Sequence, residues 1–175
     1  MADHNTYLLV LGEREAIRWV VTTGRMAFPA TPRREVAGLR EGDRLLLVST
    51  RGAFHNPTRD RTRVIGAATA ATTVEPFDDP VVLAGRVFST GCSIKLESLA
   101  PYLDGVELAP LVERLDALRG HPEWGMMLRR PLVLVSDADE ALLSSLLAPL
   151  TSDLAHTIDE YESRIVPVRQ NPNVT

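Results

Sequence analysis

The chain has 175 residues and a mass of 19.2 kDa, a length that one domain can reach while burying a substantial core without disulfides. With 45% hydrophobic residues, a mean hydropathy of −0.02 and a single cysteine, Cys92, it has the composition of a globular protein of a reducing compartment, so we expect a cytoplasmic location. No apolar run reaches the roughly 18 residues needed to cross a membrane, and the N-terminus lacks a signal-peptide pattern, so we expect neither membrane insertion nor secretion.

The net charge of −4 is unevenly distributed along the chain. Residues 1–65 contain 11 arginines and 7 acidic residues, whereas residues 66–175 contain 8 basic and 16 acidic residues. A modest basic face opposite an acidic one can still bind phosphate groups. Only one basic residue, Lys95, is a lysine. Arginine is the better bidentate phosphate ligand, although a GC-rich genome produces the same bias without functional meaning.

Hydrophobic periodicity predicts the elements of the first 40 residues. The segment TYLLVL at 6–11 predicts a short buried strand. Residues 13–24 predict a helix with Ile17, Val20 and Val21 on one face and Gly24 at its C-terminal end. Residues 24–40 have the composition of a loop with two prolines, with one helical turn near 35–39.

Two strands at 44–50 and 63–74 form the predicted centre of the fold. We expect them to be antiparallel neighbours, because a connection of about a dozen residues suits a long hairpin loop but not a βα crossover. The intervening loop is rich in arginine. The second strand is built from small residues around Gly66, which predicts that another element packs closely on it: a helix is favoured, and a ligand that approaches the strand is the alternative.

Further elements are predicted in the second half of the chain. We expect strands at 80–88 and 92–97 joined by a turn at 89–91, a helix over 108–118, and a strand at 131–135. Ser136 and Asp139 predict a capped helix start. We divide the chain into one domain at 1–150 and, at 151–175, an amphipathic helix with a polar tail that we expect to be disordered. That helix could dock on its own domain or on a second copy, which would give a homodimer.

Catalytic and metal-binding signatures are absent from the sequence, so we expect no metal and no cofactor. There is no nucleophile elbow, P-loop or dinucleotide fingerprint. No second cysteine is present to build a zinc cluster, and Cys92 is predicted to be a buried, inert thiol. The four histidines are not paired at helical spacing: His4, His55, His121 and His156.

At this point the chain resembles an EVE domain of the PUA-like superfamily, which is related to the ASCH and YTH domains. The resemblance covers residues 5–148 and rests on the order of YLLVL, a Trp-bearing helix, LREGDRLLLVST, RVIGAATAATTVEPF and LAPLVERLDALRGHPEWGMMLRRPLVLVSDADEALLSSLL. Its motifs are the turn Gly42-Asp43, the small residues from Gly66, and Trp124 ahead of the last strand. The chain departs from the family at the end of the strand that follows the Gly-Asp turn, where it has Val48, Ser49 and Thr50 in place of a Tyr and a Ser, and in a longer insert, GAFHNPTRDRTR.

The resemblance implies a mixed α/β (α+β) fold, a PUA-like β-barrel flanked by helices, with an extra C-terminal helix. It implies a non-enzymatic module that binds DNA or RNA and takes an extruded, often modified, base into an aromatic-walled pocket. By position, the base-pocket residues would be Trp19, Phe28, Ser49, Thr50, Phe54 and Asn56. The phosphate ligands would be Arg25, Arg51, Arg59, Arg61 and Arg63.

Other readings of the same residues stay open. An ASCH-like ribonuclease could use Arg51, His55 and Arg59 to polarise a phosphodiester, with Asp60 or His55 moving a proton. A small-molecule or protein-interaction module could use the barrel mouth. Trp19 and Phe28 could also belong to the core. An apolar slot between two aromatic side chains would favour the nucleic-acid reader, and a shallow His/Arg cluster would favour the nuclease.

Overall fold

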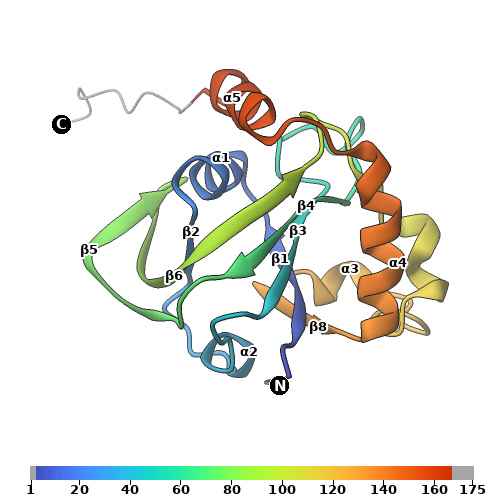
Figure 1. Ribbon diagram of the computed structural model, residues 1–175, viewed down its shortest axis with the longest axis horizontal. Coiled ribbons are helices and arrows are strands. Elements are labelled where there is room, and N and C mark those ends of the chain that lie inside the picture. The colour runs from blue at the N-terminus through green and yellow to red at the C-terminus, as the bar shows by residue number, and fades with distance from the viewer. Residues whose placement is uncertain (1–2, 167–175) are drawn as a thin grey trace.

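A strongly curled sheet forms a half-barrel in the computed structural model, which describes residues 3–166 (Figure 1). The main strand order is β2-β6-β4-β3-β1-β8, with β5 paired to β6 and β7 paired to β4. The strands are β1 (Thr6–Leu11), β2 (Arg25–Phe28), β3 (Arg44–Ser49), β4 (Arg63–Ala70), β5 (Glu75–Leu83), β6 (Arg86–Leu99), β7 (Val106–Glu107) and β8 (Leu132–Val135). The helices are α1 (Arg14–Thr23), α2 (Arg34–Ala37), η1 (Ala109–Arg114), α3 (Trp124–Met127), α4 (Asp137–Leu147), η2 (Ala148–Leu150) and α5 (Leu154–Arg164). The predicted mixed fold flanked by helices, including a C-terminal one, is confirmed.

The central strands β3 and β4 are antiparallel neighbours, as predicted, with Leu45 opposite Ala68. On its other edge β3 pairs in parallel with β1, with Leu8 opposite Leu46. The backbone of β3 is therefore hydrogen-bonded on both sides, which makes it the middle of the half-barrel and explains its continuous apolar sequence.

The core is divided between the two faces of the sheet, because side chains alternate along each strand. Leu9 and Leu45 belong to one buried cluster, which α1 and α5 cover. Leu8 and Leu46 belong to the other, which α4 and η1 cover. Figure 1 shows these two pairs of elements on different sides of the curled sheet.

The Gly42-Asp43 turn joins β3 to the N-terminal strand. Gly42 has a φ of 91°, a conformation that glycine adopts without strain. The buried carboxylate of Asp43 accepts hydrogen bonds from the backbone N–H groups of Asn5 at 2.9 Å and Arg40 at 2.8 Å. Asp43 therefore has a structural role that explains why a Gly-Asp pair precedes this strand.

The small residues of β4 accommodate both a neighbouring strand and a helix. A Cβ added at Gly66 would lie 2.6 Å from the carbonyl oxygen of Ser98 on β6. Helix α4 also packs on β4, as the sequence predicted. The side chain of Ser136 caps α4 by accepting a hydrogen bond from the N–H of Asp139, which confirms the predicted helix start.

Three predicted elements differ from the structure. Residues 86–99 form one long strand rather than a strand, a turn at 89–91 and a second strand, and the turn lies instead at Ala84-Gly85. Glycine is required at position 91 of this strand, because an added Cβ would collide with the carbonyl oxygen of Met26 and the ring of Phe77. The predicted loop at 24–40 contains strand β2, and the predicted helix at 108–118 is a shorter 3₁₀ helix, η1.

The C-terminal helix α5 packs on its own domain. Tyr161 is 1% exposed, and its hydroxyl donates a hydrogen bond to the carbonyl oxygen of Ala100 at 3.0 Å. Glu160 accepts a hydrogen bond from the N–H of Tyr102 at 2.6 Å. The predicted homodimer contact stays a prediction, and it would have to use the other face of α5.

The structure describes no residue from 167 onward, so the polar tail that we expected to be disordered lies outside the described residues. Within residues 3–166, no helix is both long and apolar enough to span a bilayer.

A candidate nucleic-acid-binding cleft

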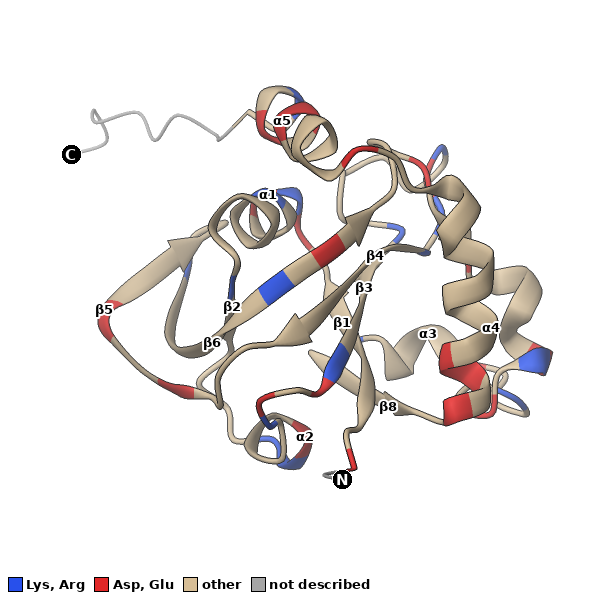
Figure 2. Cartoon of the chain, in the orientation of Figure 1, with Lys and Arg blue, Asp and Glu red and all other residues tan. Residues whose placement is uncertain are grey.

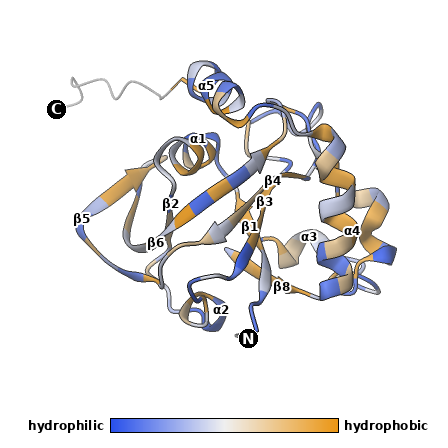
Figure 3. Ribbon diagram, viewed as in Figure 1, coloured by the Kyte–Doolittle hydropathy of each residue, from blue (hydrophilic) through white to orange (hydrophobic). Residues whose placement is uncertain are grey.

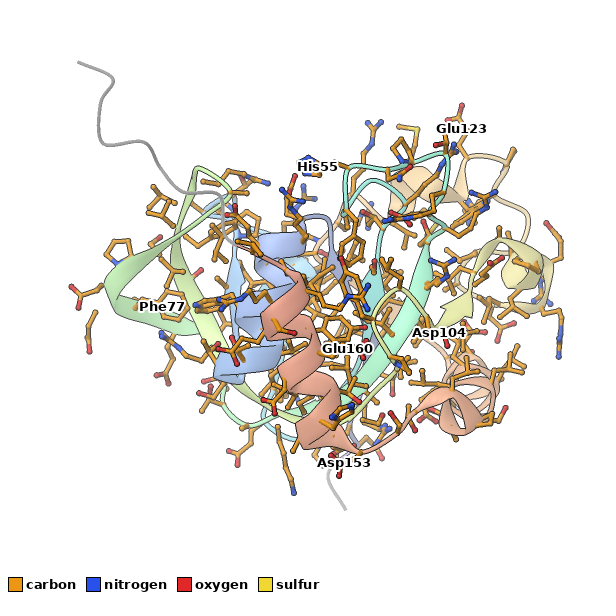
Figure 4. The ribbon with its side chains drawn as sticks, turned by 90° about the horizontal axis from the view of Figure 1, so that it is seen from above. His55, Phe77, Asp104, Glu123, Asp153 and Glu160 are labelled. Carbon is orange, nitrogen blue, oxygen red and sulfur yellow. The ribbon has the colours of Figure 1, made fainter. Side chains whose placement is uncertain are left out.

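A cleft of about 930 Å³ lies beside the ends of β1 and β2. Four other segments enclose it: helix α1, the turn between β5 and β6, the start of the arginine-rich loop at 50–62, and residues 122–131. In Figure 4, His55 from that loop and Glu123 from the last segment lie toward the same edge of the molecule. This volume is at the upper end of the range for ligand pockets, about 300–1,000 Å³, so a nucleobase fits with room for a neighbouring group.

The cleft combines aromatic side chains with an excess of positive charge. Its aromatic residues are Trp19, Phe88 and Trp124, from three different elements. Five arginines face one acidic residue, Glu13; the arginines are Arg33, Arg51, Arg86, Arg129 and Arg130. A concave surface with this charge attracts anions, because the low-dielectric walls concentrate the field.

Two of the six predicted base-pocket residues line the cleft, Trp19 and Thr50. The structure does not bring the others there. Phe28 is fully buried in the core, since β2 turns this side chain inward, and Ser49 is 5% exposed and outside the cleft lining. Phe54 packs edge-to-face against Tyr102, with ring centroids 5.4 Å apart.

Asn56 has a turn-forming role in the arginine-rich loop. Its side-chain oxygen accepts hydrogen bonds from the hydroxyl of Thr58 at 3.1 Å and the N–H of Arg59 at 3.3 Å. These are the contacts of a residue that shapes the local backbone, and Asn56 is not in the cleft lining.

Of the five predicted phosphate ligands, only Arg51 lines the cleft. Its Nε donates to the carbonyl oxygen of Pro57 at 2.6 Å, which orients the side chain. Arg25 lies next to the cleft, where its guanidinium is 5.5 Å from the Trp19 ring centroid and 4.6 Å from that of Phe77. Arg25 is therefore placed to support the Trp19 ring through cation–π contacts.

The other three arginines are engaged in contacts within the protein. Arg59 donates to both carboxylate oxygens of Asp60, at 2.6 and 2.9 Å, and this hydrogen bonding raises the pKa of the Arg59 guanidinium. Arg61 donates to the carbonyl oxygen of Asp60 at 2.9 Å, and Arg63 lies 3.8 Å from Glu107. Phosphate binding by these three arginines stays a prediction, and a phosphate would have to compete with these contacts.

Six further aromatic and arginine side chains of the cleft were not among the predicted site residues. They are Phe88, Trp124, Arg33, Arg86, Arg129 and Arg130. Trp124 was part of the family resemblance, but no role was assigned to it. The pair Arg129-Arg130, directly before β8, is the feature of the sequence that could have indicated an anion-binding segment here. Arg130 forms an ion pair with Glu35 at 3.2 Å.

The residues of the nuclease alternative make separate contacts within the protein: Arg51 with Pro57, His55 with Glu13, and Arg59 with Asp60. The Nε2 atom of His55 lies 3.0 Å from a carboxylate oxygen of Glu13. The backbone of His55 has a φ of 59°. Asp60 is buried, and Arg59 occupies both of its oxygens, which gives that carboxylate a structural role. Among the residues that the structure describes, no group of three or more His, Cys, Asp or Glu side chains is arranged to hold a metal ion.

Comparisons with known proteins show that the fold of this chain is similar to that of several solved structures. No protein-family profile matches the chain, and no curated protein sequence matches it. A hypothetical protein from Leishmania major superposes with a TM-score of 0.52 at 12% identity, covering 82% of this chain and 94% of its own. A protein from Pseudomonas putida gives a TM-score of 0.51 at 13% identity, covering 81% and 98%, and one from Rhodopseudomonas palustris gives 0.50 at 14% identity, covering 83% and 94%. At these identities the comparisons establish a shared fold alone, a curled half-barrel compatible with a PUA-like domain.

Proposed function

We propose that this chain is an EVE-type, PUA-like module that binds nucleic acid without catalysis and holds one extruded base in the cleft. The observation that carries the proposal is the combination of three aromatic side chains and five arginines, against one acidic residue, around a single concavity. Aromatic faces suit a nucleobase, and guanidinium groups suit the phosphates on either side of it.

The energetics of extruding a base require both parts of this lining. Unstacking and unpairing a base costs a few kcal/mol, and stacking on an aromatic side chain returns about 1–3 kcal/mol. Arginine–phosphate contacts supply the remainder and position the strand without reading its sequence. Thr50 offers a hydroxyl in the same cleft that can hydrogen-bond the edge of the bound base.

Replacing Trp19 by Ala tests the stacking role. We expect the variant to lose about 1–3 kcal/mol of affinity, roughly 5- to 150-fold, for an oligonucleotide that the wild type binds. The measurement is fluorescence anisotropy with DNA and RNA oligonucleotides that carry unmodified or modified bases. Trp19→Phe is the matched variant, and it should keep much of the affinity because it retains an aromatic face.

Thermal unfolding of both variants separates binding from stability. Trp19 is only partly buried, so a folded Trp19→Ala protein is a fair test of the cleft. Equal affinity of Trp19→Ala and wild type, or no binding of any oligonucleotide by the wild type, would reject the proposed function.

A further inference from the structure

The two tryptophans of the cleft come from opposite faces of the curled sheet. Trp19 packs against the core cluster that contains Leu9, whereas Trp124 packs against the cluster of the other face, which contains Leu8. Both side chains line the same cleft, yet within the described residues no ring–ring contact joins them. The cleft therefore has two separate aromatic platforms, one contributed from each face of the sheet.

Trp124 has the least engaged ring among the aromatic side chains of the cleft. The guanidinium of Arg25 lies 5.5 Å from the Trp19 ring centroid, and that of Arg86 lies 5.6 Å from the ring centroid of Phe88. In the part of the chain that the structure describes, Trp124 makes neither a cation–π nor a ring–ring contact. It is only partly buried, so packing on the core holds the ring while part of it faces the cleft. A fixed, open aromatic surface suits the stacking of a base.

Three arginines of the cleft lie at the Trp124 end. Arg129 and Arg130 follow Trp124 by little more than one turn and directly precede β8, which Figure 3 shows in the colour of hydrophobic residues. The chain enters the core there, so this pair marks the edge of the cleft. An ion pair of 3.2 Å between Arg130 and Glu35 brings the start of α2, and with it Arg33, to the same end.

The charge balance at this end favours a phosphate group. Glu35 is engaged by Arg130, and the single acidic residue of the cleft lining, Glu13, lies instead at the start of α1. Arg33 and Arg129 form no ion pair within residues 3–166. A phosphate next to Trp124 would therefore meet two guanidinium groups that have no competing carboxylate, and each can bind it through two parallel hydrogen bonds.

We infer, on the basis of the proposed function, that the cleft binds two neighbouring nucleotides of a single strand. One base stacks on Trp19 and the next on Trp124, and Arg33 and Arg129 contact the phosphate beside the second base. A duplex would have to unpair two adjacent bases, at about twice the cost of extruding one, whereas a single strand has no pairing to break. Bases that are splayed apart and stacked on aromatic side chains are typical of single-stranded ligands.

DNA pentamers made mainly of abasic residues test the two-base site. One ligand carries a single base at its centre, and the other carries two neighbouring copies of that base, so both have the same number of phosphates. Separate sets cover adenine, cytosine, guanine and thymine. With one platform, the second base adds only the small factor expected from having two equivalent bases. With two platforms, the wild type should bind the two-base ligand about 5- to 150-fold more tightly, which is the effect of one stacked base.

Replacing Trp124 by Leu should remove this advantage of the second base and leave binding of the one-base ligand at Trp19. Leucine keeps apolar packing on the core but offers no aromatic face. Trp124→Phe retains such a face and should keep much of the advantage. Met126→Ala changes an exposed residue of the same helical turn, outside the cleft lining, and is the matched control that should bind like the wild type. Thermal melts check that all three variants are folded.

Several outcomes would overturn the two-base site. They are a wild-type advantage no larger than the statistical factor, an undiminished advantage in Trp124→Leu, and tighter binding of a full DNA duplex than of either of its strands. If the one-base ligand still lost affinity in Trp19→Ala, the proposed function would stand without the second platform. Absence of wild-type binding to every pentamer and to the oligonucleotides used to test Trp19 would reject both.

Discussion

The side chain of Cys92 shows how burial determines the reactivity of a thiol in this protein. Cys92 lies on β6 between Gly91 and Ser93, and it is 4% exposed. Burial raises the pKa of its thiol to about 12, because the thiolate cannot be solvated in the core. At pH 8 only about one thiol in ten thousand would be ionised, and the thiolate is the reactive form.

We therefore expect Cys92 to react slowly with an aromatic disulfide reagent in the native protein at pH 8. Addition of guanidinium chloride should release one reactive thiol per chain, since Cys92 is the single cysteine. The measurement is the absorbance of the released thiolate with time. Rapid stoichiometric reaction of the native protein would show that β6 opens readily around this residue.

At the scale of elements, helix α5 supports the arginine-rich loop through a row of aromatic rings. Phe54 in the loop packs edge-to-face on Tyr102, and Tyr102 packs in the same way on Tyr161 of α5, with centroids 5.7 Å apart. Arg164 adds a cation–π contact, 4.8 Å from the Tyr102 ring centroid. The last helix is thus connected to the loop that places Arg51 in the cleft.

Replacing Tyr161 by Ala should lower the free energy of unfolding by about 3–5 kcal/mol, because it leaves a large cavity at a buried aromatic position. Tyr161→Phe should cost about 0.5–1.5 kcal/mol, since it removes only the hydrogen bond to Ala100. Chemical denaturation measures both, and Asp159→Ala on the exposed side of α5 is the control. Similar stability of Tyr161→Ala and Asp159→Ala would mean that α5 is not an integral part of the domain.

The elements also show which structural features could be predicted from this sequence. Buried strands such as β1 and β3 were predicted because their apolar runs are bounded by polar and turn residues. The continuous β6 was missed because Ser-Thr-Gly at 89–91 has the composition of a turn, whereas Gly91 is needed where the backbone of β2 and the ring of Phe77 approach closely. A close approach between segments far apart in sequence leaves no local pattern.

Contacts between segments far apart in sequence also limited how much of the cleft could be predicted. Trp19 and Thr50 both line the cleft, and each follows a strand of the same sheet; their role in base binding stays a prediction. Phe88 and Trp124 reach the cleft through the β5–β6 hairpin and the segment before β8, and their positions depend on the curl of the whole sheet. Phe28 was expected in the pocket because β2 was not predicted, and a strand alternates its side chains between core and surface.

Across the molecule as a whole, charge is unevenly placed: five arginines line the cleft even though the chain is acidic overall. Acidic residues cluster elsewhere, for example in the first turn of α4, which contains Asp137, Asp139 and Glu140; the start of this helix is red in Figure 2. Within the described part of the chain, Arg33 and Arg129 form no ion pair, unlike Arg59 and Arg63. Arg33 and Arg129 are therefore freer to contact phosphates than Arg59 and Arg63 are.

Neutralising Arg33 and Arg129 together, as Arg33→Gln with Arg129→Gln, should weaken binding of every oligonucleotide to a similar degree. Affinity falls as salt rises, and each lost phosphate contact makes the plot of log affinity against log salt shallower, by about 0.7 for single strands and about 0.9 for duplex DNA. We expect the double variant to have a slope smaller by about 1.4 or 1.8, measured by anisotropy titrations at several salt concentrations. The control is Lys95→Gln with Arg114→Gln, which removes the same charge outside the cleft lining. If both double variants changed the slope equally, long-range net charge and not contact in the cleft would account for phosphate binding, and the cleft would lose its assignment as the nucleic-acid site.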